Sequence, residues 1–221
     1  MNVHANSPDW TTLEHLVLDF GGVLYRIDHQ ATAQAFAELG ADGFLEQYAH
    51  GAQSALLDDL ECGQISDGAF LAQLQGQCHI GTSIDEVRAA WQAVLLDLRP
   101  DIIPVLQDLA AHYDLVLFSN TNALHAAHFE RQILDAHGRA FSDTFRQIVY
   151  SHRLGLRKPD MAAYKAVAAQ FQLKAKRTFF VDDTPANVDG ARQAGWFAGL
   201  HDPHQDTLKG WLQAMGCPIW D

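Results

Sequence analysis

The sequence has few cysteines, no long apolar run and a shortage of basic residues, and each of these absences excludes a class of protein. Its three cysteines form no C-x-x-C pair, so neither a disulfide framework nor a cysteine-based zinc site is indicated. A reducing, cytoplasmic setting is therefore expected. No stretch approaches the roughly 18 to 20 consecutive apolar residues that a membrane helix needs. The polar segment from Met1 to Trp10 lacks the apolar core of a signal peptide.

Basic residues are outnumbered by acidic ones, 15 Lys and Arg against 27 Asp and Glu, and the formal net charge is −12 at pH 7. Nucleic acids and anionic membranes need basic patches on their partners, so neither is an expected partner. A small phosphorylated metabolite remains compatible with this charge, because a metal ion and one lysine can offset it locally. With 221 residues, 48% of them hydrophobic, the chain can form one domain with a sizeable insertion.

Short apolar runs bounded by polar or turn residues recur along the chain, with helical patterns between them. Such runs are typical of buried parallel strands, and their alternation with helices predicts an α/β fold with a doubly wound parallel sheet. Helices are expected to begin at Asp101, Thr121, Pro159 and Pro185, since polar caps and proline both suit a first turn. The predicted strands are 16–20, 115–118, 147–150, 178–181 and 196–200.

The gap between the first two predicted strands is too long for a simple crossover, and most of it has helical patterns. Ser66 can cap one helix, and Ser83 with Glu86 forms a capping box for another. The following stretch places apolar residues on one helical face; these are Val87, Trp91, Val94, Leu95 and Leu98. We therefore predict a small all-helical insertion at residues 28–98, and a Rossmann-like core formed by residues 1–27 and 99–221.

Carboxylates follow two of the predicted strands. Asp19 precedes Gly21 and Gly22, and Asp182 and Asp183 follow the strand 178–181. Turn and helix capping account for a single aspartate at such a place. They do not account for two adjacent carboxylates, which repel each other unless a cation lies near them. The functional alternative is an aspartate nucleophile beside a Mg²⁺ site, because Mg²⁺ prefers oxygen ligands.

Two further motifs lie where the same edge of the sheet is expected. Ser119 and Asn120 join a strand to a helix, and they serve either as ordinary caps or as part of a phosphate site at a helix N-terminus. Lys158 precedes Pro159; alone it would be a solvated lysine, but beside a carboxylate nucleophile it can neutralise phosphoryl oxygens. Ligand sites of open α/β sheets collect at the carboxyl ends of the strands. Because all of these motifs are expected at that edge, a functional site is favoured over ordinary capping.

The order of these motifs resembles that of the haloacid dehalogenase-like (HAD) superfamily of hydrolases, across essentially the whole chain. The helical insertion stands in the place of that family's C1 cap. Segments 63–67, 91–94, 98–100 and 154–159 are further similar to bacterial phosphatases that act on α-D-glucose 1-phosphate, and the N-terminal phosphatase domain of epoxide hydrolases is a more distant relative. The motifs that carry the family resemblance are Asp19-x-Gly21-Gly22-Val23, Ser119-Asn120, Lys158-Pro159 and Asp182-Asp183.

The resemblance implies a Mg²⁺-dependent phosphomonoester hydrolase that works through an aspartyl-phosphate intermediate. Asp19 would be the nucleophile. The resemblance further implies that Ser119, Asn120 and Lys158 bind the substrate. The implied metal ligands are Asp19, Asp183 and the backbone carbonyl of Gly21.

Gly21 departs from the family pattern, because most of its phosphatases have a second aspartate at this position. That aspartate protonates the leaving oxygen and later activates water, help that is typically worth about 10² to 10⁴ in rate. A sugar 1-phosphate has a relatively acidic leaving group and needs less protonation, so an anomeric phosphate is a sensible substrate. Tyr25, Asp28 and His29 are candidates for a replacement acid.

Two alternatives belong to other classes of function. A 2-haloacid dehalogenase would use Asp19 without a metal, although Asp182 and Asp183 would repel its acidic substrate. A binding or regulatory protein would follow if Gly21 marks lost activity. His125 and His128 are three residues apart on a predicted helix, but no third ligand accompanies them, and we interpret them as packing or surface histidines.

Overall fold

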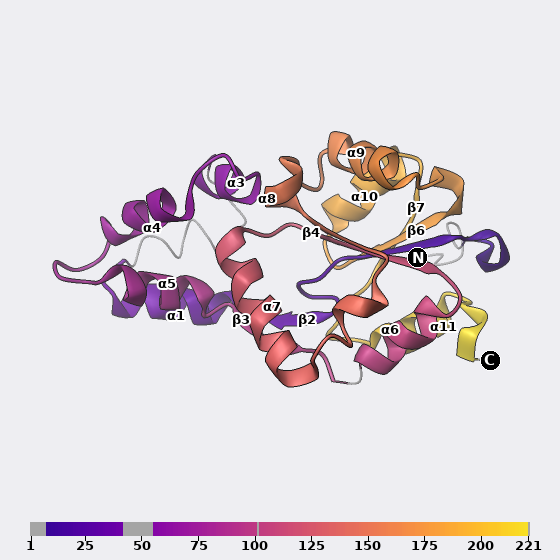
Figure 1. Ribbon diagram of the computed structural model, residues 1–221, viewed down its shortest axis with the longest axis horizontal. Helices are drawn as coiled ribbons and strands as arrows, with labels where there is room; N and C mark the ends of the chain where they lie inside the picture. Colours follow the sequence, from indigo (N-terminus) through magenta and orange to yellow (C-terminus); the bar gives the residue numbers. More distant parts are fainter. Residues whose placement is uncertain (1–7, 42–54, 101, 221) are drawn as a thin grey trace.

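The computed structural model describes residues 8–41, 55–100 and 102–220, and its centre is a five-stranded parallel sheet (Figure 1). The strands lie in the order β5-β4-β1-β6-β7, so the chain winds outward in both directions from β1. This confirms the predicted α/β fold with a doubly wound sheet. The strands are β1 (His15–Leu18), β4 (Asp114–Ser119), β5 (Gln147–Tyr150), β6 (Thr178–Asp182) and β7 (Phe197–Leu200).

The register of the sheet decides which residues share its carboxyl edge. Leu18, the last residue of β1, lies opposite Leu117 of β4 and Val181 of β6. The backbone N–H of Asp19 continues this ladder by donating to the carbonyl of Val181 at 2.9 Å. The residues immediately after these strands therefore lie together, at the edge where open α/β sheets bind ligands.

Helices cover both faces of the sheet, because alternate strand residues point to opposite faces. Leu16 and Leu18 join a buried cluster with α6, α7 and α11, whereas Val17 joins a second cluster with α9 and α10. These helices are α6 (Ile102–Ala110), α7 (Ala123–His137), α9 (Met161–Phe171), α10 (Pro185–Gln193) and α11 (Leu208–Ala214). The short helical segments are α8 (Ser151–Leu154), η2 (Trp10–Thr12), η3 (Ser142–Thr144), η4 (Ala175–Arg177) and η5 (Pro218–Trp220).

The remaining helices form a separate group at one end of the molecule, on the left of Figure 1. We call this group the helical unit; its members are α1 (His29–Glu38), α3 (Ala55–Glu61), α4 (Asp67–Gln75) and α5 (Ile84–Gln92). It has a buried cluster of its own, whose described members include Leu124 of α7 and no residue of the five-stranded sheet. Ser66 caps α4, and Ser83 with Glu86 forms the predicted capping box of α5.

The prediction that the helical face continues through Leu98 is wrong. Helix α5 ends at Gln92, and β3 (Leu95–Leu98) pairs antiparallel with β2 (Tyr25–Ile27). The pairing satisfies backbone groups of both segments where the chain passes between the core and the helical unit, a long-range effect that overrides local helical periodicity. An ion pair between Arg26 and Asp97 at 2.5 Å adds to it.

Two predicted helix starts are displaced, and one lies outside the described residues. Helix α7 is capped by Asn122 in place of Thr121, and α9 is capped by Asp160, so Pro159 precedes the helix. In both cases an Asn or Asp side chain accepts a backbone N–H, the strongest kind of N-cap. Pro185 does occupy the first turn of α10. Asp101 is not among the described residues.

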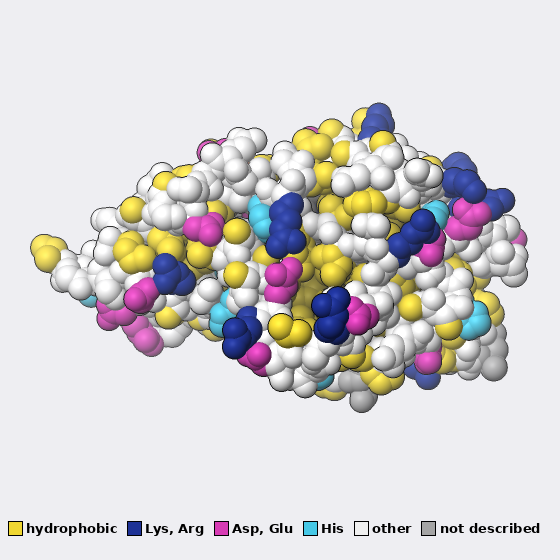
Figure 2. All heavy atoms as spheres, viewed as in Figure 1, with side chains coloured by type: hydrophobic (Ala, Val, Ile, Leu, Met, Phe, Trp, Pro, Cys, Tyr) yellow, Lys and Arg dark blue, Asp and Glu magenta, His cyan; other side chains and the backbone are white. Residues whose placement is uncertain are grey.

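Charges on the face drawn in Figure 2 are dispersed. Among the described residues on that face, the basic side chains form small separate groups, most of them beside an acidic one. In the described part of the chain, no helix has both the length and the apolar character to cross a membrane.

Candidate active site at the sheet edge

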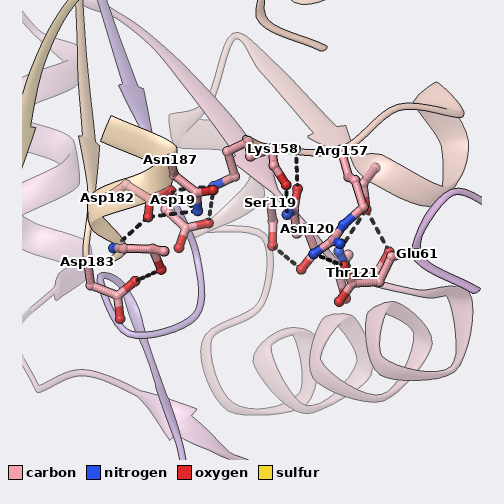
Figure 3. Close-up of polar contacts among 12 residues, drawn as sticks. Asp19, Glu61, Ser119, Asn120, Thr121, Arg157, Lys158, Asp182, Asp183 and Asn187 are labelled. Atoms are coloured by element: carbon pink, nitrogen blue, oxygen red, sulfur yellow. Dashed lines mark hydrogen bonds and ion pairs between the residues drawn. The ribbon is translucent and has the colours of Figure 1, made fainter. Parts of the chain in front are cut away.

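A buried lysine connects two strand ends. Lys158 Nζ donates to Asp19 Oδ1 at 2.7 Å and to Asp182 Oδ2 at 2.6 Å, and only 1% of the Lys158 side chain is exposed (Figure 3). The rings of Phe118 and Phe180 flank the ammonium group. Because a buried ammonium group needs partners of opposite charge, these two carboxylates fix the lysine at the sheet edge. The lysine is therefore not solvated.

Three carboxylates converge beside that lysine. One oxygen from each of Asp19, Asp182 and Asp183 lies within 4.8 Å of the others. Burial raises the pKa of Asp19, and repulsion by the other two carboxylates adds to the rise while Lys158 opposes it. Burial and the charge of Asp182 raise the pKa of Asp183 in the same way. One lysine does not balance three carboxylates, so this oxygen-rich cluster suits a divalent cation.

The two adjacent aspartates differ in how many hydrogen bonds their carboxylate oxygens accept. Asp182 is fully buried and accepts hydrogen bonds from Lys158, the Thr184 backbone N–H and Asn187 Nδ2. Among the described residues, the donor to the Asp183 carboxylate is the neighbouring hydroxyl of Thr184 at 3.3 Å. Asp183 therefore retains the capacity to bind a cation that Asp182 has largely lost.

The two glycines after Asp19 differ in whether their positions could carry a side chain. Gly22 has a φ of +80°, and a Cβ there would lie 1.8 Å from Asp183 Oδ2, so a side chain is excluded. At Gly21 the backbone does not need glycine, and a Cβ would make only ordinary contact, 3.5 Å from the Ile27 side chain. Space and backbone conformation therefore leave room for a side chain at Gly21, where the usual second aspartate is missing.

Ser119 and Asn120 lie at the end of β4, as predicted, but the Asn120 side chain is already engaged. It donates to the backbone carbonyl of Lys158 at 2.8 Å and accepts from the backbone N–H of Lys158 at 2.9 Å. This pair of bonds positions the loop that carries the lysine. Ser119 is buried, and within the described ranges its hydroxyl makes one long contact, of 3.4 Å with the Asn120 carbonyl. Ser119 is therefore the more available of the two for a ligand.

A cavity of about 130 Å³ lies between the sheet edge and the helical unit. The core contributes Gly21 and Ser119 to its wall, whereas the helical unit contributes Leu57, Glu61 and Trp91. His125 of α7 also lines it, stacked on Trp91, and its Nε2 donates to the Trp91 carbonyl at 3.0 Å. This contact confirms the interpretation of His125 as a packing histidine.

The three candidate replacement acids lie in different surroundings in the structure. Tyr25 is fully buried and hydrogen-bonded to Gln132, and burial raises its pKa to about 12. Asp28 caps α1 by accepting two backbone N–H groups. His29 lines the cavity, and burial lowers its pKa. Of the three, only His29 belongs to the cavity wall.

Sequence analysis did not identify Arg157 as a residue that links the core to the helical unit. It precedes Lys158, but it forms ion pairs with Asp58 and Glu61 of α3. Because these partners are so distant in sequence, no local pattern predicts the contacts. One signal was present: Arg157 belongs to the segment 154–159 that carries part of the resemblance.

Comparison with known proteins defines the family. Residues 13–195 match the haloacid dehalogenase-like hydrolase family, and the chain belongs to that family and is a hydrolase of its fold. The sequence is 27% identical to D-ribitol-5-phosphate phosphatase of Bacteroides thetaiotaomicron over 187 residues, covering 83% of this chain and 89% of that protein. It is 29% identical to sesquiterpene phosphatase astK of Aspergillus oryzae over 214 residues, covering 94% and 99%.

Solved structures agree with the fold. A HAD family enzyme from Bacteroides thetaiotaomicron, in complex with magnesium and inorganic phosphate, superposes with a TM-score of 0.80 at 22% identity, over 90% of this chain and 98% of that one. A predicted HAD-like hydrolase from Porphyromonas gingivalis gives a TM-score of 0.78 at 24% identity, over 92% and 98%. At these identities the likeness supports the fold, and the chemistry must be argued from the site.

Proposed function

We propose that the protein is a Mg²⁺-dependent phosphomonoester hydrolase that acts on a small phosphorylated metabolite bearing hydroxyl groups, such as a sugar or polyol phosphate. The observation that carries this proposal is the buried cluster of Asp19, Asp182, Asp183 and Lys158 at the carboxyl edge of the sheet. The similar proteins include a D-ribitol-5-phosphate phosphatase and a sesquiterpene phosphatase. Glucose 1-phosphate is one member of the proposed substrate class.

The donor set fits Mg²⁺. Asp19 and Asp183 would hold the ion, with the backbone carbonyl of Gly21 as a third ligand. Burial raises the pKa values of both carboxyls, and repulsion from the neighbouring carboxylates adds to the rise; a bound cation offsets that repulsion. When bound, the ion would neutralise charge on the phosphoryl oxygens.

Asp19 is the proposed nucleophile. Its carboxylate attacks phosphorus in line, the bond from phosphorus to the leaving oxygen breaks, and an aspartyl-phosphate forms. Lys158 donates to Asp19 Oδ1, which leaves Oδ2 as the attacking oxygen. Water then attacks the phosphorus of the aspartyl-phosphate, releasing inorganic phosphate and restoring Asp19.

Lys158 and Ser119 are the proposed phosphate-binding residues. The Asn120 side chain holds the Lys158 backbone in place, so we assign the Asn120 side chain a positioning role and reserve any phosphate contact for its backbone. Fixed donors of this kind stabilise the transferring group without reorganising during the reaction.

We further propose that residues 28–98 act as a cap over the site. The helical unit supplies one wall of the cavity, and the cavity reaches Gly21 and Ser119 at the sheet edge. A leaving group seated there would be screened from bulk water. Because no acid stands at Gly21, a leaving group that departs with little protonation, such as an anomeric oxygen, is favoured.

Release of phosphate from a panel of sugar, polyol and nucleotide phosphates, with and without Mg²⁺, tests the proposal. Turnover should require Mg²⁺ and should be lost in Asp19→Asn. Asp189→Asn is the matched control, because Asp189 is an exposed aspartate of α10 paired with Arg192. Metal-independent release of halide from a 2-haloacid would favour the dehalogenase, and ligand binding without turnover would favour a binding protein.

A further inference from the structure

Two consecutive residues point in opposite directions from the loop after α8. Lys158 binds Asp19 and Asp182 in the core, whereas Arg157 binds Asp58 and Glu61 in the helical unit, with 2.9 Å between Arg157 Nη2 and Glu61 Oε2. The Arg157 side chain is 16% exposed. One short loop therefore fixes the catalytic lysine and, at the same time, the helix α3 that lines the cavity.

Glu61 is the acidic residue of this cavity wall, and its hydrogen-bonding capacity is only partly used. Oε2 is buried and lies 2.9 Å from Arg157 Nη2, so Arg157 holds this end of the carboxylate. In the part of the chain that the structure describes, Arg157 is the residue paired with Glu61. Burial raises the pKa of Glu61, and Arg157 opposes that shift. Arg157 is shared between Glu61 and Asp58, and the Glu61 side chain is 27% exposed and lines the cavity, so its carboxylate keeps lone pairs for a donor.

Glu61 lies away from the phosphorus position. In Figure 3, Asp19 and Glu61 are on opposite sides of Ser119 and Asn120. A substrate whose phosphate sits at Asp19 would bring the far part of its leaving group to Glu61. Much of the wall around Glu61 is apolar, including Leu57 and Trp91, so a carboxylate there discriminates strongly between leaving groups with and without a donor.

We propose that Glu61 is a specificity-determining residue that accepts hydrogen bonds from hydroxyl groups of the leaving group, and that Arg157 is the positioning residue that holds it. Hydroxyl groups are the donors that the proposed substrate class of sugar and polyol phosphates offers to such a carboxylate. The inference rests on the proposed phosphatase function. It adds which part of the substrate the helical unit recognises, namely the leaving group.

A matched pair of substrates and a matched pair of variants test the inference. D-ribitol 5-phosphate and n-pentyl phosphate have the same number of carbons but differ in hydroxyl groups. Asp58 pairs with Arg157 as Glu61 does, but it is not part of the cavity wall and is 43% exposed. We expect Glu61→Ala to lower kcat/KM for ribitol 5-phosphate by about 10- to 100-fold, the usual range for a lost hydrogen bond to a charged group. Turnover of pentyl phosphate should change less than about threefold, within the spread of near-neutral substitutions.

Asp58→Asn separates recognition from the ion pair. It should leave the ratio of the two kcat/KM values unchanged, because Asp58 contacts Arg157 and not the cavity. Equal losses for both substrates in Glu61→Ala, or the same change of ratio in Asp58→Asn, would overturn the role of Glu61. Absence of Mg²⁺-dependent turnover of these two compounds and of every other phosphate in the panel by the unmodified protein would instead reject the proposed function, and this inference with it.

Discussion

The sheet edge and the helical unit face the same cavity, but they are held together in different ways. At the edge, Asp19, Lys158 and Asp182 are joined by short hydrogen bonds inside a buried network. The helical unit packs around its own apolar cluster and meets the site through side chains such as Trp91 and Glu61. Substitutions at the edge should therefore change the rate for every substrate, whereas substitutions in the helical unit should change which substrate is preferred.

The largest effect is expected from the edge itself. Lys158→Met removes the ammonium group that orients Asp19 and leaves three carboxylates without their cation. We expect kcat to fall by about 10² to 10³ for all substrates, the range for loss of one preorganised donor. Steady-state kinetics on a phosphorylated and hydroxylated substrate, compared with pentyl phosphate, measures this. A loss confined to one of the two substrates would contradict the division between edge and helical unit.

The two adjacent glycines provide the next test. Gly22→Ala places a Cβ against Asp183 and requires a left-handed φ, so we expect loss of most Mg²⁺-dependent activity. Gly21→Asp fits sterically and supplies the missing carboxylate. We expect it to raise kcat for pentyl phosphate by about 10- to 100-fold, the lower part of the usual range for general acid catalysis.

The gain in Gly21→Asp should be smaller for glucose 1-phosphate, since its leaving group needs less protonation. Gly21→Asn serves as the control because it has nearly the same size but cannot donate a carboxyl proton. Equal rates for the Asp and Asn variants would show that protonation of the leaving group does not limit the reaction.

Mg²⁺ should stabilise the folded protein as well as support turnover. A ligand present at about 10 to 100 times its Kd stabilises by roughly 1.4 to 2.7 kcal/mol, which thermal unfolding with and without Mg²⁺ detects as a rise in Tm. Asp183→Asn should reduce this rise, whereas Asp189→Asn, on the exposed side of α10, should preserve it. The same rise in both variants would locate the ion elsewhere.

The last effect concerns the contact between α7 and the helical unit, and it changes stability without involving catalysis. Burial lowers the pKa of His125 to about 4, against an unfolded value near 6.5. Between these values the unfolded chain binds a proton that the folded protein does not, so stability is retained above about pH 6.5 and falls as the pH drops toward 4. The contribution is at most about 3 kcal/mol.

Chemical denaturation at pH 7 and at pH 4.5 measures this dependence. His125→Gln should have a smaller difference between the two free energies of unfolding than the unmodified protein, and substitution of the exposed His112 should not change the difference. An unchanged difference in His125→Gln would assign the acid sensitivity to other groups.

The sequence predicted the sheet edge far better than the cavity wall. Asp19, Ser119 and Asp182 each follow an apolar run, and parallel strands bring such positions together by a local rule. Glu61 and Arg157 meet because of how the helical unit packs on the core, with Asp58 and Arg157 separated by 99 residues. Likewise, β3 was predicted as helix because its partner strand β2 is distant in sequence.

The covalent role of Asp19 is the central claim, and trapping of the intermediate tests it most directly. The protein is mixed with Mg²⁺ and excess substrate, quenched in acid within the first turnover, digested and analysed by mass spectrometry. We expect one phosphoryl group on the peptide that contains Asp19, lost in Asp19→Asn and retained in Asp189→Asn. Turnover with no phosphorylated peptide, or a phosphoryl group on another residue such as Ser119, would contradict the account.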